Sequence, residues 1–96
     1  MPFFVLYCLD KPNALATRMA AREAHLGYVR ESGVVRQAGP LLDDAGEMAG
    51  SLLIVEAPDR AAAEAFSAAD PYVQAGLFER VEIRPFKPTI GPLQPS

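Results

Sequence analysis

The chain contains one histidine, His25, and it follows Arg22 by three residues. An imidazole can take or give a proton near neutral pH. A guanidinium stays charged, so it must be paired or wet wherever a helix packs it inward. Residues three apart are neighbours on one side of a helix. This pair is therefore the first candidate for acid–base chemistry and for binding an oxyanion.

Two further residues could complete such a site. Asp70 could orient the imidazole, and Tyr72 adds a hydroxyl close by in the sequence. The pair Asp70-Pro71 is also typical of a helix start, and capping alone would explain the aspartate. Bland alternatives stay open for the other two residues. His25 could be a boundary histidine with one satisfied hydrogen bond, and Arg22 a long stem packed on the core with its head in water.

Other chemistries have little support in the sequence. Cys8 is the only cysteine, which excludes an intrachain disulfide, and its apolar surroundings favour a buried, inert thiol. There is no paired-cysteine motif, nucleophile elbow or Gly-rich phosphate loop. His25 has no second His and no nearby Cys as a co-ligand, so we expect neither a metal nor a cofactor. A haem- or flavin-handling barrel is a minor alternative, supported only by His25 as a lone axial ligand.

Length and composition predict one globular domain. Half of the 96 residues are apolar, which is an ordinary balance for a folded chain. The formal charge of −3, with Lys and Arg scattered, argues against nucleic-acid and membrane-surface partners. The apolar run 3–9 is too short to span a bilayer, and the first residues lack the pattern of a signal peptide. We therefore expect a cytoplasmic location.

Hydrophobic periodicity and breaker residues predict the elements. Strands are expected at 3–9, 34–42, 47–56 and 78–86, and a long helix at 14–32 that ends at Gly33 in a left-handed conformation. A second helix is capped by Asp59, and a short one begins at Asp70. The inner faces expected for the two main helices are Leu15, Met19, Leu26 and Val29 in the first, and Ala62, Ala65, Phe66 and Ala69 in the second. Tyr28 falls outside the first stripe and is expected at the surface.

The order of these elements is βαββαβ, which predicts an α+β, ferredoxin-like fold with a four-stranded antiparallel sheet. The first and third strands are apolar on both faces, as the central strands of that topology must be. Two helices cover only one face of the sheet and leave an apolar patch on the other. We therefore expect a homodimer joined through that face, and a pocket between the first helix and the sheet.

Several segments together resemble the YciI-like (YCII-related) family over residues 3 to about 86. They are Arg22-Glu-Ala-His25-Leu26-Gly-Tyr28, Gly33, Ala38-Gly39-Pro40-Leu41, Gly50-Ser51, and Asp70-Pro71-Tyr72 with Ala75-Gly76-Leu77. The resemblance implies that a ferredoxin-fold domain at 1–87 pairs into a dimeric α/β barrel, and that 88–96 is a Pro-rich tail outside the family pattern. It also implies an active site with a histidine–aspartate pair, which corresponds to His25 and Asp70.

The resemblance bears on the reaction too. One branch of the family eliminates chloride from chlorinated hydroxyquinones, and related barrels include muconolactone isomerases and cofactor-free monooxygenases. We therefore hypothesise a lyase or isomerase without a cofactor, in which His25 and Asp70 move a proton on a small oxygenated substrate, cyclic or chlorinated. Arg22 and Tyr72 would bind that substrate. The alternative is a non-catalytic dimer that binds a small metabolite or acts as an accessory module.

Overall fold

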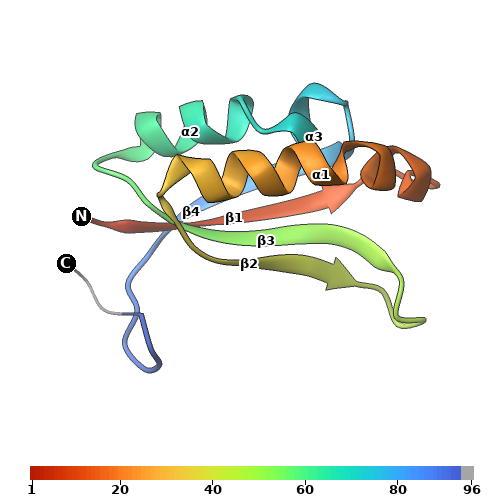
Figure 1. Cartoon of the computed structure of the whole chain (residues 1–96). Helices are drawn as coiled ribbons and strands as arrows, with labels where there is room; N and C mark the ends of the chain where they lie inside the picture. The colour runs from red at the N-terminus through yellow and green to blue at the C-terminus, as the bar shows by residue number, and fades with distance from the viewer. Residues whose placement is uncertain (94–96) are drawn as a thin grey trace.

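A computed structural model describes residues 1–93. Its elements are β1 (Phe3–Asp10), α1 (Leu15–Ser32), β2 (Val35–Leu42), β3 (Met48–Glu56), α2 (Arg60–Ala68), α3 (Pro71–Gln74) and β4 (Phe78–Phe86). The strands form one antiparallel sheet in the order β2-β3-β1-β4, and the helices lie together on one side of it (Figure 1). The predicted ferredoxin-like α+β fold is confirmed.

The central strands β1 and β3 supply most of the core. Alternate residues of each strand point toward the helices, and those that form the buried cluster are Phe4, Leu6, Cys8, Leu53 and Val55. Their register pairs Leu6 with Leu53 and Cys8 with Ser51. Gly50 is needed beside this pairing, because any side chain there would collide with the backbone carbonyl oxygen of Cys8.

The predicted helix ends are confirmed. Gly33 ends α1 with a left-handed φ of 69°. Asp59 caps α2, and its carboxylate accepts the backbone N–H of Ala62 at 2.9 Å. Asp70 caps α3 in the same way, with Pro71 in the first helical position. These caps fix where α1, α2 and α3 begin or end over the sheet.

The predicted inner face of α1 is partly wrong. Leu26 and Val29 are half-buried and Val29 packs against the core, but the other two predicted residues lie exposed. Leu15 and Met19 are 40% and 50% exposed, whereas the buried residues of this helix are Arg18 and His25. Burying polar side chains costs free energy unless they are paired. Here Arg18 and His25 both find carboxylate partners on other elements. The helix can therefore turn its polar side inward.

The predicted inner face of α2 is also partly wrong. Ala63 and Ser67 are its buried residues, while Ala65 and Ala69 are exposed. Phe66 packs against the core, as predicted, and also stacks against α1, with its ring centroid 5.0 Å from that of Tyr28. Tyr28 is accordingly half-buried rather than at the surface, and its hydroxyl donates to the carbonyl oxygen of Phe66 at 2.7 Å.

The opposite face of the sheet carries no helix (Figure 1). We call it the open face. Strand alternation and register assign to it Val5, Tyr7 and Leu9 of β1, Leu52 and Ile54 of β3, and Arg80, Glu82 and Arg84 of β4. Its centre is therefore apolar and its β4 edge is charged.

The segment after β4 passes to the side of the sheet away from the helices (Figure 1). Residues 87–93 form neither helix nor strand. Residues 94–96 of the expected tail lie outside the described residues. No helix within the described part of the chain is long and apolar enough to cross a membrane.

Candidate active site

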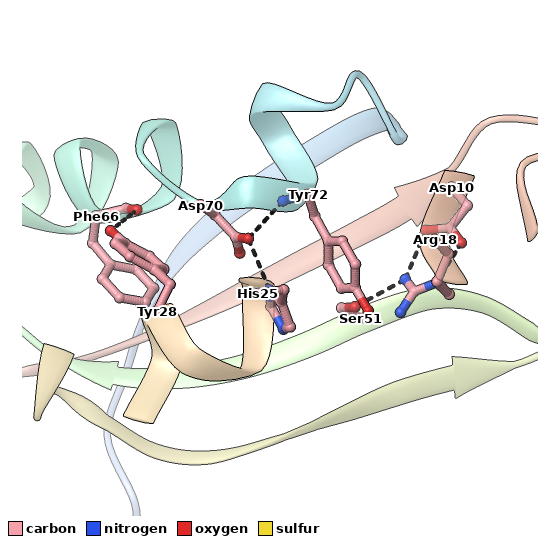
Figure 2. A network of polar contacts seen from close by, with 8 residues as sticks. All are labelled: Asp10, Arg18, His25, Tyr28, Ser51, Phe66, Asp70 and Tyr72. Atoms are coloured by element: carbon pink, nitrogen blue, oxygen red, sulfur yellow. Dashed lines mark hydrogen bonds and ion pairs between the residues drawn. The ribbon is translucent and has the colours of Figure 1, made fainter. Parts of the chain in front are cut away.

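His25 and Asp70 meet between α1 and the start of α3. The Nδ1 atom of His25 lies 2.7 Å from Oδ1 of Asp70, and the two residues are only 6% and 3% exposed (Figure 2). The same carboxylate oxygen accepts the backbone N–H of Tyr72 at 2.9 Å. Asp70 therefore both caps the helix and binds the histidine.

This contact selects a tautomer. A carboxylate is only an acceptor, so a neutral His25 bonded to it carries its proton on Nδ1. The Nε2 atom then keeps a lone pair and can accept a proton. A histidine oriented by a carboxylate in this way is the usual arrangement of a general base.

Tyr72 packs flat against the imidazole. The ring centroids of His25 and Tyr72 are 3.9 Å apart and their planes differ by 14°. Burial raises the pKa of the Tyr72 hydroxyl, although the charges of Arg18 and Arg22 oppose that shift. The hydroxyl therefore stays protonated at neutral pH and can donate a hydrogen bond.

Arg18 lies on the other side of Tyr72, with its guanidinium carbon 4.7 Å from the ring centroid (Figure 2). Its Nε and Nη2 donate to the two carboxylate oxygens of Asp10, each at 2.8 Å, and Nη2 also donates to Ser51 Oγ at 2.9 Å. Burial opposes the charge of Arg18, but the hydrogen bonds and charge of Asp10 outweigh it and raise the pKa of the guanidinium. This arginine is buried and neutralised.

A cavity of about 260 Å³ opens beside these residues, between α1 and the β2–β3 half of the sheet. Polar side chains on its wall come from Arg18, Arg22, His25, Ser51 and Tyr72, and the rest of the wall is Leu26, Val29, Ala38, Gly39, Pro40, Met48, Leu52 and Leu53. Small-molecule sites span about 300–1,000 Å³, so this cavity suits a compound of about one ring.

Arg22 differs from Arg18 although it lies one turn further along α1. It is exposed, and within residues 1–93 it forms no ion pair. Its charge is nonetheless close enough to act on the pKa of Tyr72. Arg22 is therefore the wall cation whose charge remains available to an anionic group in the cavity.

A larger hollow of about 450 Å³ lies at the β1–α1 and β2–β3 connections. It contains Asp10, Lys11, Asp43 and Glu47, but neither His25 nor Asp70. The side chains there lack an oriented base, so the chemistry points to the smaller cavity.

Comparison with known proteins agrees with this architecture. The YCII-related domain matches residues 2–87. The chain belongs to the YCII-related domain family. Protein YciI of Escherichia coli is 38% identical over 93 residues, which cover 88% of this chain and 95% of that protein.

Solved structures extend the comparison. The 5-chloro-2-hydroxyhydroquinone dehydrochlorinase TftG of Burkholderia phenoliruptrix, in complex with 2,5-dihydroxybenzoquinone, superimposes with a TM-score of 0.81 at 32% identity, over 88% of this chain and 93% of TftG. An antibiotic biosynthesis monooxygenase shares the fold alone, with a TM-score of 0.59 at 14% identity, over 94% of this chain and all of that one. The fold of this YCII-related chain is therefore that of the dimeric α/β barrel proteins.

The four residues singled out from the sequence come together. His25 and Asp70 form the hydrogen bond, and His25, Tyr72 and Arg22 line one cavity. Their chemical roles stay predictions.

Sequence reasoning missed Asp10, Arg18 and Ser51. One signal was available: Arg18 precedes His25 by two helical turns and so shares its face. Asp10 continues the inward alternation of Cys8 at the end of β1.

Cys8 is buried near this network, and burial raises the pKa of its thiol to about 12. It is therefore a thiol at neutral pH and not a nucleophile. Within residues 1–93, no group of three His, Cys, Asp or Glu side chains is arranged to hold a metal ion.

Proposed function

We propose that this protein is a cofactor-independent enzyme of the lyase or isomerase type. His25 and Asp70 would move a proton on a small, oxygenated, cyclic substrate. The observation that carries the proposal is the buried 2.7 Å contact between His25 and Asp70 at the wall of a one-ring cavity.

Each wall residue has a distinct role in this scheme. Nε2 of His25, which Asp70 leaves free, takes a proton from a carbon or hydroxyl of the substrate. The electron pair of the broken bond moves onto a substrate oxygen, and Arg22 stabilises the resulting oxyanion together with the Tyr72 hydroxyl. In an isomerase, the His25 imidazolium returns the proton to another atom. In a lyase, a leaving group such as chloride departs with its bonding electrons.

The substrate class is supported by the cavity and by TftG. TftG is a dehydrochlorinase whose structure holds 2,5-dihydroxybenzoquinone, a flat molecule of one ring. The cavity of about 260 Å³ includes Arg22, which has no ion pair among residues 1–93. It suits a compound of that size that carries a phenolate, enolate or carboxylate. Halogenated hydroquinones are therefore the first substrates to try.

We also propose that a second copy of the chain covers the open face. Tyr7 at the centre of this face is 39% exposed in the single chain, and an apolar sheet face of this kind is typically covered by another sheet. Sedimentation analysis at several protein concentrations tests this homodimer. The cytoplasmic location expected from the sequence stays a prediction.

The decisive experiment compares variants on a panel of halogenated hydroquinones, lactones and enolisable acids. We expect His25→Ala to lower kcat/KM about 10²- to 10⁴-fold, because general-base catalysis contributes that much. Asp70→Asn should also lower it, and Glu23→Gln, an exposed change on the same helix, should not. Undiminished turnover by His25→Ala would refute the role of the imidazole. Tight binding without turnover across the panel would favour the non-catalytic alternative.

A further inference from the structure

We propose that the Arg18–Asp10 ion pair is a positioning unit for His25. It would act through the Tyr72 ring, which it holds against the face of the imidazole. The inference rests on the proposed function only in naming His25 as the base.

The arrangement is a layered stack. Tyr72 lies between the imidazole, at 3.9 Å, and the guanidinium of Arg18, at 4.7 Å (Figure 2). Arg18 and His25 are seven residues apart on α1, which is two helical turns and about 10 Å along the axis. That spacing admits one aromatic ring between the two side chains. Tyr72 lies in the first turn of α3 and Asp70 caps it, so the start of this helix contacts His25 both at the ring face and at Nδ1.

The outer layer of the stack is fixed by the sheet. Asp10 at the end of β1 holds the guanidinium by two hydrogen bonds of 2.8 Å, and Ser51 on β3 accepts a third at 2.9 Å. Arg18 is only 2% exposed. A guanidinium held by a bidentate pair has a fixed position and orientation. Here that pair holds the guanidinium carbon of Arg18 over the Tyr72 ring. A lysine ammonium has neither the fork nor the flat face.

This support matters because a single hydrogen bond does not orient a ring. The contact with Asp70 fixes Nδ1, but the imidazole could still turn about the line that joins the two atoms. Stacking on Tyr72 removes that freedom and so fixes the direction in which Nε2 points. Misplacement of a reacting group by about 1 Å can cost about 10²-fold in rate. Arg18 is thus a positioning residue and does not itself bind the substrate oxyanion.

The protein's single histidine makes the test clean, because the His25 ring gives one set of proton NMR signals. Stacking on Tyr72 shifts those signals upfield through the ring current. Tyr72→Leu gives the unstacked reference, and Tyr72→Phe should keep the wild-type shift. We expect Arg18→Lys, and the double variant Asp10→Asn/Arg18→Met, to move the signals most of the way to the unstacked reference. Arg22→Met, one turn away, should leave them unchanged.

Retention of the wild-type shift by folded Arg18→Lys would overturn the proposal. If the double variant does not fold, Arg18→Lys alone still tests the proposal. It keeps a positive charge beside Asp10, so the Asp10 carboxylate is not left unpaired. The measurement needs no substrate, so its failure is distinct from failure of the proposed function. On any substrate that the wild type turns over, Arg18→Lys should lower kcat about 10- to 100-fold with little change in KM. A fall in stability with kcat unchanged would mean a structural role only.

Discussion

The two faces of the sheet use the same ion-pair chemistry in opposite surroundings. Under the helices, Arg18 and Asp10 form a pair whose side chains are 2% and 6% exposed. On the open face, Arg84 donates to Glu82 at 2.6 Å in a pair that is 72% and 28% exposed. Exposed pairs contribute little and are screened by salt, whereas a buried pair that loses one partner leaves a charge in a dry interior.

The pKa shifts also differ between the two sides of the sheet. On the side covered by the helices, burial raises the pKa values of Cys8 and Tyr72. On the open face, hydrogen bonding from Arg84 and the charge of Arg80 lower the pKa of Glu82. Desolvation therefore sets the direction of the pKa shift for Cys8 and Tyr72, whereas ion pairing sets it for Glu82.

The largest expected effect comes from breaking the buried pair. Arg18→Met leaves the Asp10 carboxylate without its partner, and we expect it to lower the free energy of unfolding by about 3–5 kcal/mol. The midpoint of urea unfolding measures this. Arg84→Met is the matched control, and its midpoint should stay close to that of the wild type. Similar losses in both variants would abolish the distinction between the faces.

The sequence predicted the fold well because the signals for its elements are either local, as at the helix ends, or follow the residue-by-residue alternation of a strand. β1 and β3 are apolar on both faces, which identified them as central strands. Gly33 and the Asp70-Pro71 pair marked helix ends through backbone chemistry that needs no tertiary information. His25 and Asp70 were found as a pair because of the family resemblance, since 45 residues separate them.

The orientation of α1 could not be predicted from its apolar residues. Its buried face carries Arg18 and His25, and their burial depends on carboxylates supplied by other elements. A stripe of Leu and Met next to such residues gives the wrong rotation of the helix, because only the tertiary structure shows which charges are paired. The Tyr72 stack depends on the same information.

A smaller loss of stability should appear at alkaline pH, and it should come from groups on the helix-covered side of the sheet. The folded pKa of Cys8 is about 12, compared with about 9 for an unperturbed thiol. From about pH 9 upward the unfolded chain loses this proton while the folded chain keeps it, so stability falls as the pH rises toward 12. The slope from this group is at most about 1.4 kcal/mol per pH unit.

Urea unfolding at a series of alkaline pH values measures this slope for the wild type and for Cys8→Ala. The variant should have a shallower slope whatever its absolute stability. Some slope should remain, because burial also raises the pKa values of Tyr28 and Tyr72. Equal slopes in the two proteins would mean that the thiol is not protected by burial.

The smallest expected effect on stability belongs to Glu82. It tests whether the open face is exposed to solvent or is covered by a second copy of the chain. Because its pKa is lowered in the folded chain, its contribution is present above about pH 4.5 and is lost as the pH falls through the folded value. In a single chain this contribution is weak and screened, so Glu82→Gln should barely move the unfolding midpoint, and high salt should remove the difference.

A homodimer through this face would desolvate the row Arg80–Glu82–Arg84. The same substitution would then destabilise the protein more, with an effect that depends on protein concentration and resists salt. Unfolding of both proteins at two concentrations and two salt levels therefore shows whether this second ion-pair cluster is buried like the first.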